Sequence, residues 1–176
     1  MRYRRADVTG GTYFFTVNLA ERKRTLVDHV DLLRSVIRGV KANHPFSIDA
    51  MVILPDHLHA LWTLPLGDAD YPTRWALLKA GFSRQIPKDE RRNKSCMAKG
   101  ERGLWQRRYW EHLIRDERDY ARHVDYHHNP VTHGYVNQAS DWPHSSIHRF
   151  IQEGTVGKNW GGSVFVAENG EFGEPK

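Results

Sequence analysis

The hydrophobic residues of this chain fall into short runs that are typical of strands and into longer periodic stretches that are typical of helices. The short runs are rich in aromatic and β-branched residues, which favours strands. They lie at residues 12–19, 46–54 and 57–64, and a shorter one with its lead-in lies within residues 104–114. Only Pro55-Asp56 separates the second run from the third. A connection this tight makes those two strands antiparallel.

Helices are predicted where apolar residues recur every three or four positions. This spacing marks residues 28–43 and 73–86, and a short helical piece is expected at 147–151. A further helix is predicted over residues 116–129, capped by Asp116 and ended by Pro130. The polar stretch 87–103 lacks periodicity and is predicted to be a mobile loop. The order β-α-β-β-α-β-α predicts an α+β fold, with an antiparallel sheet of four to five strands and helices packed against it.

Length and composition indicate one soluble domain. The chain has 176 residues, enough for a single core, which we expect in residues 1–150. The Gly-rich tail, residues 151–176, is expected to pack loosely or to become ordered on a partner such as DNA. Cys96 is the single cysteine, so an internal disulfide is excluded. No stretch approaches 18 apolar residues, and we therefore expect a cytoplasmic protein with no membrane partner.

The charge of the chain favours a polyanionic partner. Lys and Arg exceed Asp and Glu by 26 to 21, and the pI is about 9.4. Several arginines adjoin aromatic residues, which suits phosphate contacts and base stacking, although core tryptophans beside solvated arginines would give the same pattern. The residues expected to contact DNA are Arg2, Arg4, Arg5, Lys79, Arg84, Arg107 and Arg108.

A His-Leu-His sequence on the third predicted strand is the first candidate for chemistry. Side chains alternate along a strand, so His57 and His59 share one face while Leu58 points into the core. Two adjacent imidazoles can hold a metal ion, although a lone pair of this kind is more often two polar positions on a half-buried strand. Asp56 could orient a histidine or cap the turn, and we favour the turn cap.

The late helix offers the second half of a site. Tyr126 and Asn129 are three residues apart, hence on one helical face. If that face meets the histidine pair, then His57, His59 and Asn129 can form a metal site with Tyr126 beside it. For Tyr120, packing is favoured over a nucleophilic role. A structural role is favoured for His112, and surface or packing roles are expected of the histidines at positions 123, 133, 144 and 148.

Five sequence blocks together resemble a known family. They are GGTYFFTVNL, ILPD followed by HLH, RRYWEH, HVDYHHNPVTHGYV and DWPHSS. Over about residues 3–150, the chain resembles the single-tyrosine HUH transposases, and more narrowly the REP-associated tyrosine transposases, which act on repetitive extragenic palindromes in bacterial genomes. The resemblance implies the ferredoxin-like HUH endonuclease fold and a bacterial protein associated with the nucleoid. It also implies single-stranded DNA with a hairpin as partner, and a monomer is expected over a dimer.

The same resemblance implies roles for individual residues. His57 and His59 would hold a divalent ion, Mg²⁺ or Mn²⁺, and Asn129 would be a further ligand. Tyr126 would be the nucleophile that forms a 5′-phosphotyrosine link and frees a 3′-OH. Mn²⁺ is the better match to imidazole ligands.

One departure from the family pattern leaves alternatives open. The family has three residues between Tyr and Asn, whereas this chain has only His127 and His128 between Tyr126 and Asn129. The first hypothesis is a DNA nicking and strand-transfer enzyme. The second is a catalytically impaired protein that binds DNA hairpins. A metal-dependent hydrolase using the histidine pair ranks last, because it leaves Tyr126 unexplained.

Overall fold

A computed structural model of the chain describes residues 7–21, 23–92, 94–125 and 129–160, and excludes the side chain of Asn129. The predicted nucleophile Tyr126 lies outside the described residues, and so do Arg2, Arg4 and Arg5. None of the helices in the described ranges is both long enough and apolar enough to cross a bilayer.

Four strands form one antiparallel sheet, in the order β2-β3-β1-β4. They are β1 (Thr12–Asn18), β2 (Ser47–Ile53), β3 (His57–Thr63) and β4 (Trp110–Leu113). All four predicted strands are therefore confirmed, and the strand that carries the histidine pair lies inside the sheet. Residues 144–146 extend the sheet at the β2 edge, where Ile53 N–H donates to His144 O at 2.8 Å.

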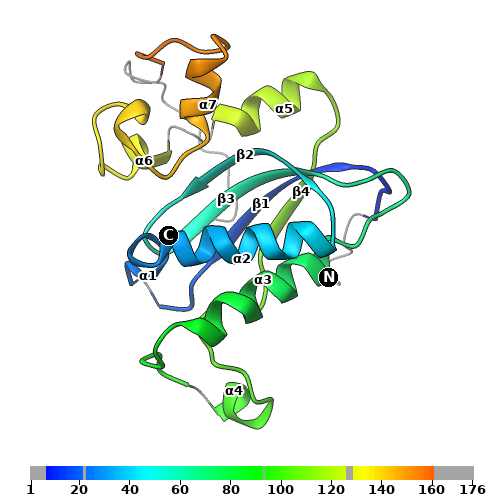
Figure 1. Ribbon diagram of the computed structural model, residues 1–176, viewed down its shortest axis with the longest axis vertical. Helices are drawn as coiled ribbons and strands as arrows, with labels where there is room; N and C mark the ends of the chain where they lie inside the picture. The colour runs from blue at the N-terminus through cyan, green and yellow to red at the C-terminus, as the bar shows by residue number, and fades with distance from the viewer. Residues whose placement is uncertain (1–6, 22, 93, 126–128, 161–176) are drawn as a thin grey trace.

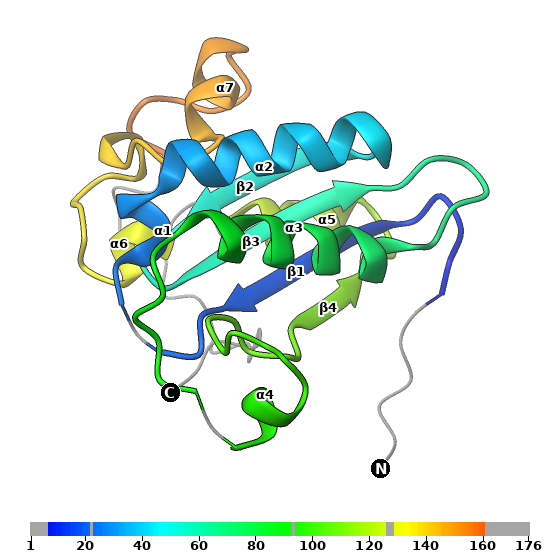
Figure 2. The same cartoon turned by 60° about the horizontal axis from the view of Figure 1, so that its bottom comes forward.

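Helices cover both faces of this sheet (Figures 1 and 2). One face carries α2 and α3, and α5 lies across the opposite face. The helical elements are α1 (Thr25–Asp28), α2 (Val30–Asn43), α3 (Tyr71–Gln85), α4 (Lys94–Ala98), α5 (Glu117–Val124), α6 (Asn129–Thr132), the 3₁₀ turn η2 (Ala139–Asp141) and α7 (Ile147–Gln152). This arrangement confirms the predicted α+β fold. The predicted boundary between domain and tail, at residue 150, falls inside α7.

The main core lies between the sheet and the α2–α3 layer. Aromatic rings fill its centre: Trp62 of β3 stacks on Trp75 of α3 with ring centroids 4.1 Å apart. Phe15 of β1 packs against both indoles. A side chain of this size contributes roughly 1.5–3 kcal/mol when it is fully buried, so this core fixes the sheet on which the candidate site is built.

A smaller apolar cluster lies on the opposite face. Its buried members are Phe14, Ala50 and Leu61, and the helical side chains packed on it include Tyr120 and Val124 of α5. The predicted packing role of Tyr120 is thereby supported. This cluster holds α5 against the face of the sheet that also carries the histidine pair.

The region predicted to be a mobile loop, residues 87–103, contains α4, and in it Cys96 is buried. An ion pair between Arg102 and Glu90 ties the segment to the end of α3, because the same guanidinium donates to the carbonyl of Ile86. Because residues 94–98 are helical, the prediction of a loop was wrong there. Arg102 and Glu90, which the sequence suggested were solvent-exposed, form contacts within the protein instead.

The late helix is also shorter than predicted. Asp116 caps it as expected, accepting a hydrogen bond from Asp119 N–H at 2.8 Å, but α5 ends at Val124. Pro130 does not end a helix. It lies in the first turn of α6, where its missing N–H costs nothing. Asn129 is the first residue of α6, and residues 126–128, between the two helices, lie outside the described part of the chain.

Candidate active site

Strand β3 places His57 and His59 side by side on one face. Their register partners on β1 are Asn18 and Thr16, and paired residues of antiparallel strands point the same way. The two imidazole centroids are 5.1 Å apart and the rings are nearly perpendicular. Leu58 between them is buried in the main core on the other face. The alternation predicted from the sequence is confirmed, and both histidines are more than nine-tenths buried.

Each imidazole is oriented by a hydrogen bond at its Nδ1 atom. His57 Nδ1 lies 2.7 Å from Asp56 Oδ1, and His59 Nδ1 lies 2.9 Å from Thr16 Oγ1. With Nδ1 held in this way, Nε2 is the ring nitrogen suited to a metal, which is the usual arrangement of metal-binding histidines. The contact of the Asp56 carboxylate with His57 supports the other role considered for this residue, which is to orient a histidine.

A third histidine lies near the pair and was missed as a functional candidate. The ring centroid of His133 is 5.2 Å from that of His57. His133 follows α6 directly and is exposed, so it can approach a ligand from the solvent side. The only sequence signal for it is its position four residues after Asn129, one helical turn further along the chain.

The donor set fits a divalent cation. Two buried, oriented imidazoles supply two nitrogen ligands, and further positions must come from another residue, substrate or water. Asn129 begins α6 and remains the predicted third ligand. Tyr126 lies two residues beyond the end of α5, and α5 is held on the histidine face through Phe14, whose ring stacks on His59 with centroids 5.5 Å apart.

Three of the predicted DNA-binding cations gather at the His57 end of the sheet. Gln106 N–H donates to the carbonyl of Asn18, which is the register partner of His57. Lys79 donates to the carbonyl of the same Gln106 at 2.9 Å, and Arg107 and Arg108 follow it directly.

These cations differ in how far they are already engaged. Arg107 is paired with Glu101 at 2.7 Å, and Lys79 lies over the Tyr109 ring. Arg108 is exposed, and so is Arg84 on α3. The exposed pair can therefore meet phosphates without breaking an ion pair that the structure describes.

Comparison with known proteins finds relatives that match nearly the whole chain. No family model matches the chain. The REP-associated tyrosine transposase of Escherichia coli (strain K12) is 44% identical over 171 residues, which cover 96% of this chain and 96% of that protein. A Haemophilus influenzae protein of the same family name is 46% identical over 173 residues, covering 97% of this chain and 98% of its own.

A solved structure of a protein from the same family also matches the chain. The structure of a REP-associated tyrosine transposase bound to a REP hairpin matches with a TM-score of 0.84 and 42% identity, covering 100% of this chain and 98% of that one. The fold is thus the α+β fold of the HUH endonucleases, with helices on both faces of an antiparallel sheet and a histidine pair on an inner strand. The chain belongs to the REP-associated tyrosine transposases.

Proposed function

We propose that this protein is a metal-dependent transposase that recognises single-stranded DNA folded into a hairpin, nicks it and rejoins the strands. The observation that carries the proposal is the buried pair His57 and His59, each oriented by a hydrogen bond at Nδ1. The hairpin bound by the related transposase supports the choice of substrate.

In this proposal, His57, His59 and Asn129 hold a divalent ion, Mg²⁺ or Mn²⁺. When bound, the ion would polarise the scissile phosphate and neutralise charge on it. Asp56 accepts from His57 Nδ1–H and so favours the tautomer that presents Nε2, and the Thr16 hydroxyl can accept from His59 Nδ1–H in the same tautomer. Burial of the pair excludes water, so each imidazole stays in one orientation before substrate arrives.

Tyr126 acts as the nucleophile. Its phenol oxygen attacks phosphorus and forms the tyrosine–phosphate bond, the bond from phosphorus to O3′ breaks, and the proton ends on the freed 3′-OH. The resulting 5′-phosphotyrosine keeps the energy of the phosphodiester. A second 3′-OH can then attack it, which rejoins DNA without a nucleotide cofactor.

DNA is held by the cations beside the His57 end of the sheet. Arg107 and Arg108 supply phosphate contacts, with Lys79 and Arg84 from α3. Such contacts fix the position of the strand, while stacking of unpaired bases on aromatic rings adds affinity. Arg2, Arg4 and Arg5 extend the same basic character at the start of the chain.

A second candidate function is hairpin binding without catalysis. It is favoured by one observation, the interval between Tyr126 and Asn129, which is one residue shorter than in the family. Among the described residues, α5 ends at Val124 and α6 begins at Asn129.

A covalent-adduct experiment distinguishes the candidates. Wild-type protein is incubated with Mn²⁺ and a labelled hairpin oligonucleotide with single-stranded flanks, and adducts are resolved on a denaturing gel. We expect an adduct that Tyr126→Phe abolishes and that the matched variant Tyr120→Phe retains. Tight binding in a mobility-shift assay with no wild-type adduct would establish the binding protein instead. Undiminished strand cleavage by Tyr126→Phe would point to a metal-dependent hydrolase.

A further inference from the structure

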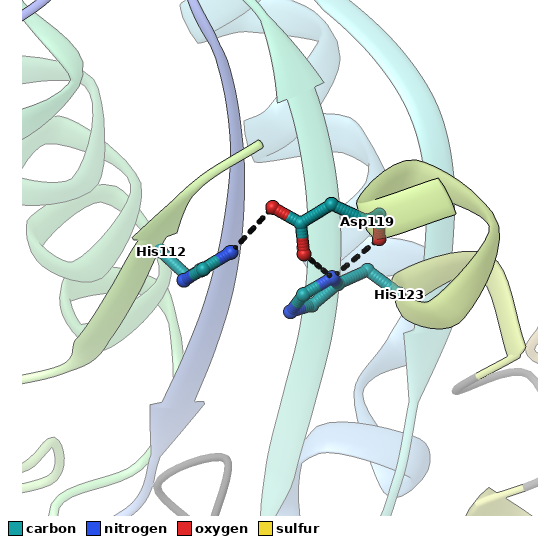
Figure 3. A group of neighbouring side chains, drawn as sticks. All are labelled: His112, Asp119 and His123. Atoms are coloured by element: carbon teal, nitrogen blue, oxygen red, sulfur yellow. Dashed lines mark hydrogen bonds and ion pairs between the residues drawn. The ribbon is translucent and has the colours of Figure 1, made fainter. Parts of the chain in front are cut away.

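Three potential metal ligands converge between β4 and α5, away from the predicted ligand set. They are His112 of β4 and, one helical turn apart on α5, Asp119 and His123. Figure 3 shows both imidazoles pointing toward the Asp119 carboxylate. It is the one group of three such ligands found among the residues that the structure describes.

The separations of the ligand atoms suit a single small ion. His112 Nε2 lies 2.8 Å from Asp119 Oδ2, and His123 Nδ1 lies 3.3 Å from Asp119 Oδ1. All three ligand atoms fall within 4.8 Å of one another. Ligands about 2.0–2.2 Å from a zinc ion stand roughly 3–3.5 Å apart. Both separations from Asp119 are close to this spacing, and the near-parallel imidazole rings would have to tilt toward a common point to enclose an ion.

The surroundings keep the imidazoles close together. The His112 and His123 rings stack with centroids 4.6 Å apart, and Trp110 stacks beside His112 at 5.7 Å. Phe14 closes the inner side, 4.8 Å from the His123 ring. The His123 side chain is 2% exposed and that of His112 is 25% exposed, so the cluster has a buried interior and an entry from solvent.

The protonation states also suit a cation. Burial lowers the pKa of His123 below its ordinary value, which keeps the ring neutral at pH 7. Burial opposes ionisation of Asp119, but hydrogen bonds from His112 and from Arg115 N–H outweigh it, and the pKa of this carboxyl lies below its ordinary value. Neutral imidazoles and an ionised carboxylate are the forms that bind metal.

We propose that His112, Asp119 and His123 form a second metal site, separate from the His57 and His59 pair and suited to a transition metal such as Zn²⁺. Two nitrogen ligands and one carboxylate oxygen, with water in a fourth position, match the preference of Zn²⁺ and of Co²⁺ over that of Mg²⁺. The ion would lie between the Asp119 carboxylate and the two imidazole nitrogens that now contact it. To bind the ion, each imidazole would carry its N–H on its other ring nitrogen, and His123 Nδ1 would give up its 2.7 Å hydrogen bond to Asp119 O.

An ion at this site would cross-link β4 to α5. Because α5 ends two residues before Tyr126, the cross-link would fix the helix that leads to the proposed nucleophile. The two sites also touch through one ring, since Phe14 packs on both His123 and His59. We therefore expect the second site to have a structural role: it would hold α5 and Phe14 in place next to the His57 and His59 pair.

Co²⁺ binding tests the proposal independently of DNA cleavage. The chain has 11 histidines, so untagged protein is used, with Co²⁺ counted by equilibrium dialysis and its ligand field followed by visible absorption. In a His57→Ala/His59→Ala background we expect one bound Co²⁺ per chain. Asp119→Asn should weaken this binding at least 100-fold, and His44→Gln, a half-buried histidine elsewhere, should leave it unchanged.

Two further measurements keep the test decisive. In the otherwise wild-type chain, Asp119→Asn or the milder His112→Gln should lower the bound Co²⁺ by one equivalent. Zn²⁺ should raise the Tm of the double-alanine background but not that of the same background with His112→Gln. Absence of Co²⁺ binding in the background, or binding that persists in both Asp119→Asn and His112→Gln, would overturn the proposal and leave a hydrogen-bonded carboxylate between two histidines.

Discussion

The carboxylate of Asp56 lies 2.7 Å from Nδ1 of His57, its neighbour in the sequence, and the two side chains are only 12% and 5% exposed. A contact between adjacent residues is unusual within a strand, because their side chains point to opposite faces. Here Asp56 precedes the first residue of β3, so its side chain is free to turn toward the histidine. The result is a carboxylate that can hold the imidazole of a proposed metal ligand in one tautomer.

Asp56→Asn should therefore weaken Mn²⁺ binding at the histidine pair. The amide can still accept a hydrogen bond, but it lacks the negative charge that makes the imidazole a stronger ligand. Loss of such a partner costs about 10- to 100-fold in metal affinity. Isothermal titration with Mn²⁺ measures this directly. Asp28→Asn, at a carboxylate 60% exposed on α1, is the control and should leave the Kd unchanged. An unaltered Kd in Asp56→Asn would mean that the carboxylate only shapes the turn.

Thr16 holds the second imidazole, and its hydroxyl can be removed without changing the volume of the side chain. Thr16 is fully buried and its Oγ1 lies 2.9 Å from His59 Nδ1. Thr16→Val deprives a buried ring nitrogen of this hydrogen bond, at a cost of about 1–3 kcal/mol. Thr16→Ser keeps the hydroxyl and loses only a methyl group, roughly 0.8 kcal/mol.

Urea denaturation in the presence of a chelator should thus rank the proteins as wild type, then Thr16→Ser, then Thr16→Val in falling stability. The valine variant should also bind Mn²⁺ more weakly than the serine variant. If valine proves as stable as serine, the hydroxyl does not orient the ring.

The strands could be predicted from the sequence because their apolar runs are local and end at turn residues. Alternation alone gave the shared face of His57 and His59, and the order of strands put them inside the sheet. What sequence reasoning could not find are contacts that only folding creates. The cluster of His112, Asp119 and His123 joins a strand to a helix. The ring of His133 lies beside that of His57, although 76 positions separate the two residues in the sequence.

Two errors have physical reasons. The charged stretch 87–103 was expected to be a loop because it lacks apolar periodicity, yet it contains α4, and its Arg102 and Glu90 form an ion pair. The helix expected to reach Asn129 ends at Val124. Pro130, expected to stop that helix, lies in the first turn of α6, because proline suits a first turn as well as a stop. The roles of Tyr126 and Asn129 depend on the family pattern and stay predictions.

A pair of glycines tests how closely the two helices on the main face approach each other. A methyl group at Gly81 of α3 would come within 2.9 Å of Val36 Cγ1 on α2, whereas one at Gly39 of α2 would have no neighbour within 4 Å. Gly81→Ala forces the helices apart, which typically costs 1–3 kcal/mol, partly offset by about 1 kcal/mol from helix propensity. Gly39→Ala has the propensity gain alone and should stabilise the protein by up to about 1 kcal/mol.

Thermal unfolding should therefore show a lower Tm for Gly81→Ala and a higher Tm for Gly39→Ala. Equal and raised Tm values for both variants would show that α2 and α3 have room between them. Because the two residues share the same chemistry and both lie within helices, the comparison isolates the contact with Val36.

The ion pair of Glu90 with Arg102 should make the order of residues 87–103 depend on pH. Arg102 donates to both carboxylate oxygens of Glu90, at 2.5 and 2.6 Å, and the carboxylate is only 4% exposed. These hydrogen bonds lower the pKa of Glu90 from 4.5 to about 2. A group whose pKa is lowered by folding stabilises the folded state above its ordinary value. The contribution is fully present above pH 4.5 and is lost as the pH falls from 4.5 toward about 2.

Glu90→Gln removes this contribution at pH 7. Charge-assisted hydrogen bonds of this kind are worth about 1.5–3 kcal/mol, so amide hydrogen exchange across residues 87–103 should become about 10- to 100-fold faster. The difference from wild type should shrink as exchange is measured at pH values falling from 4.5 toward 2. Glu101→Gln is the control, because its partner Arg107 is 45% exposed, and exposed pairs contribute at most about 1 kcal/mol. Equal acceleration by the two variants would show that the buried pair does not hold the segment.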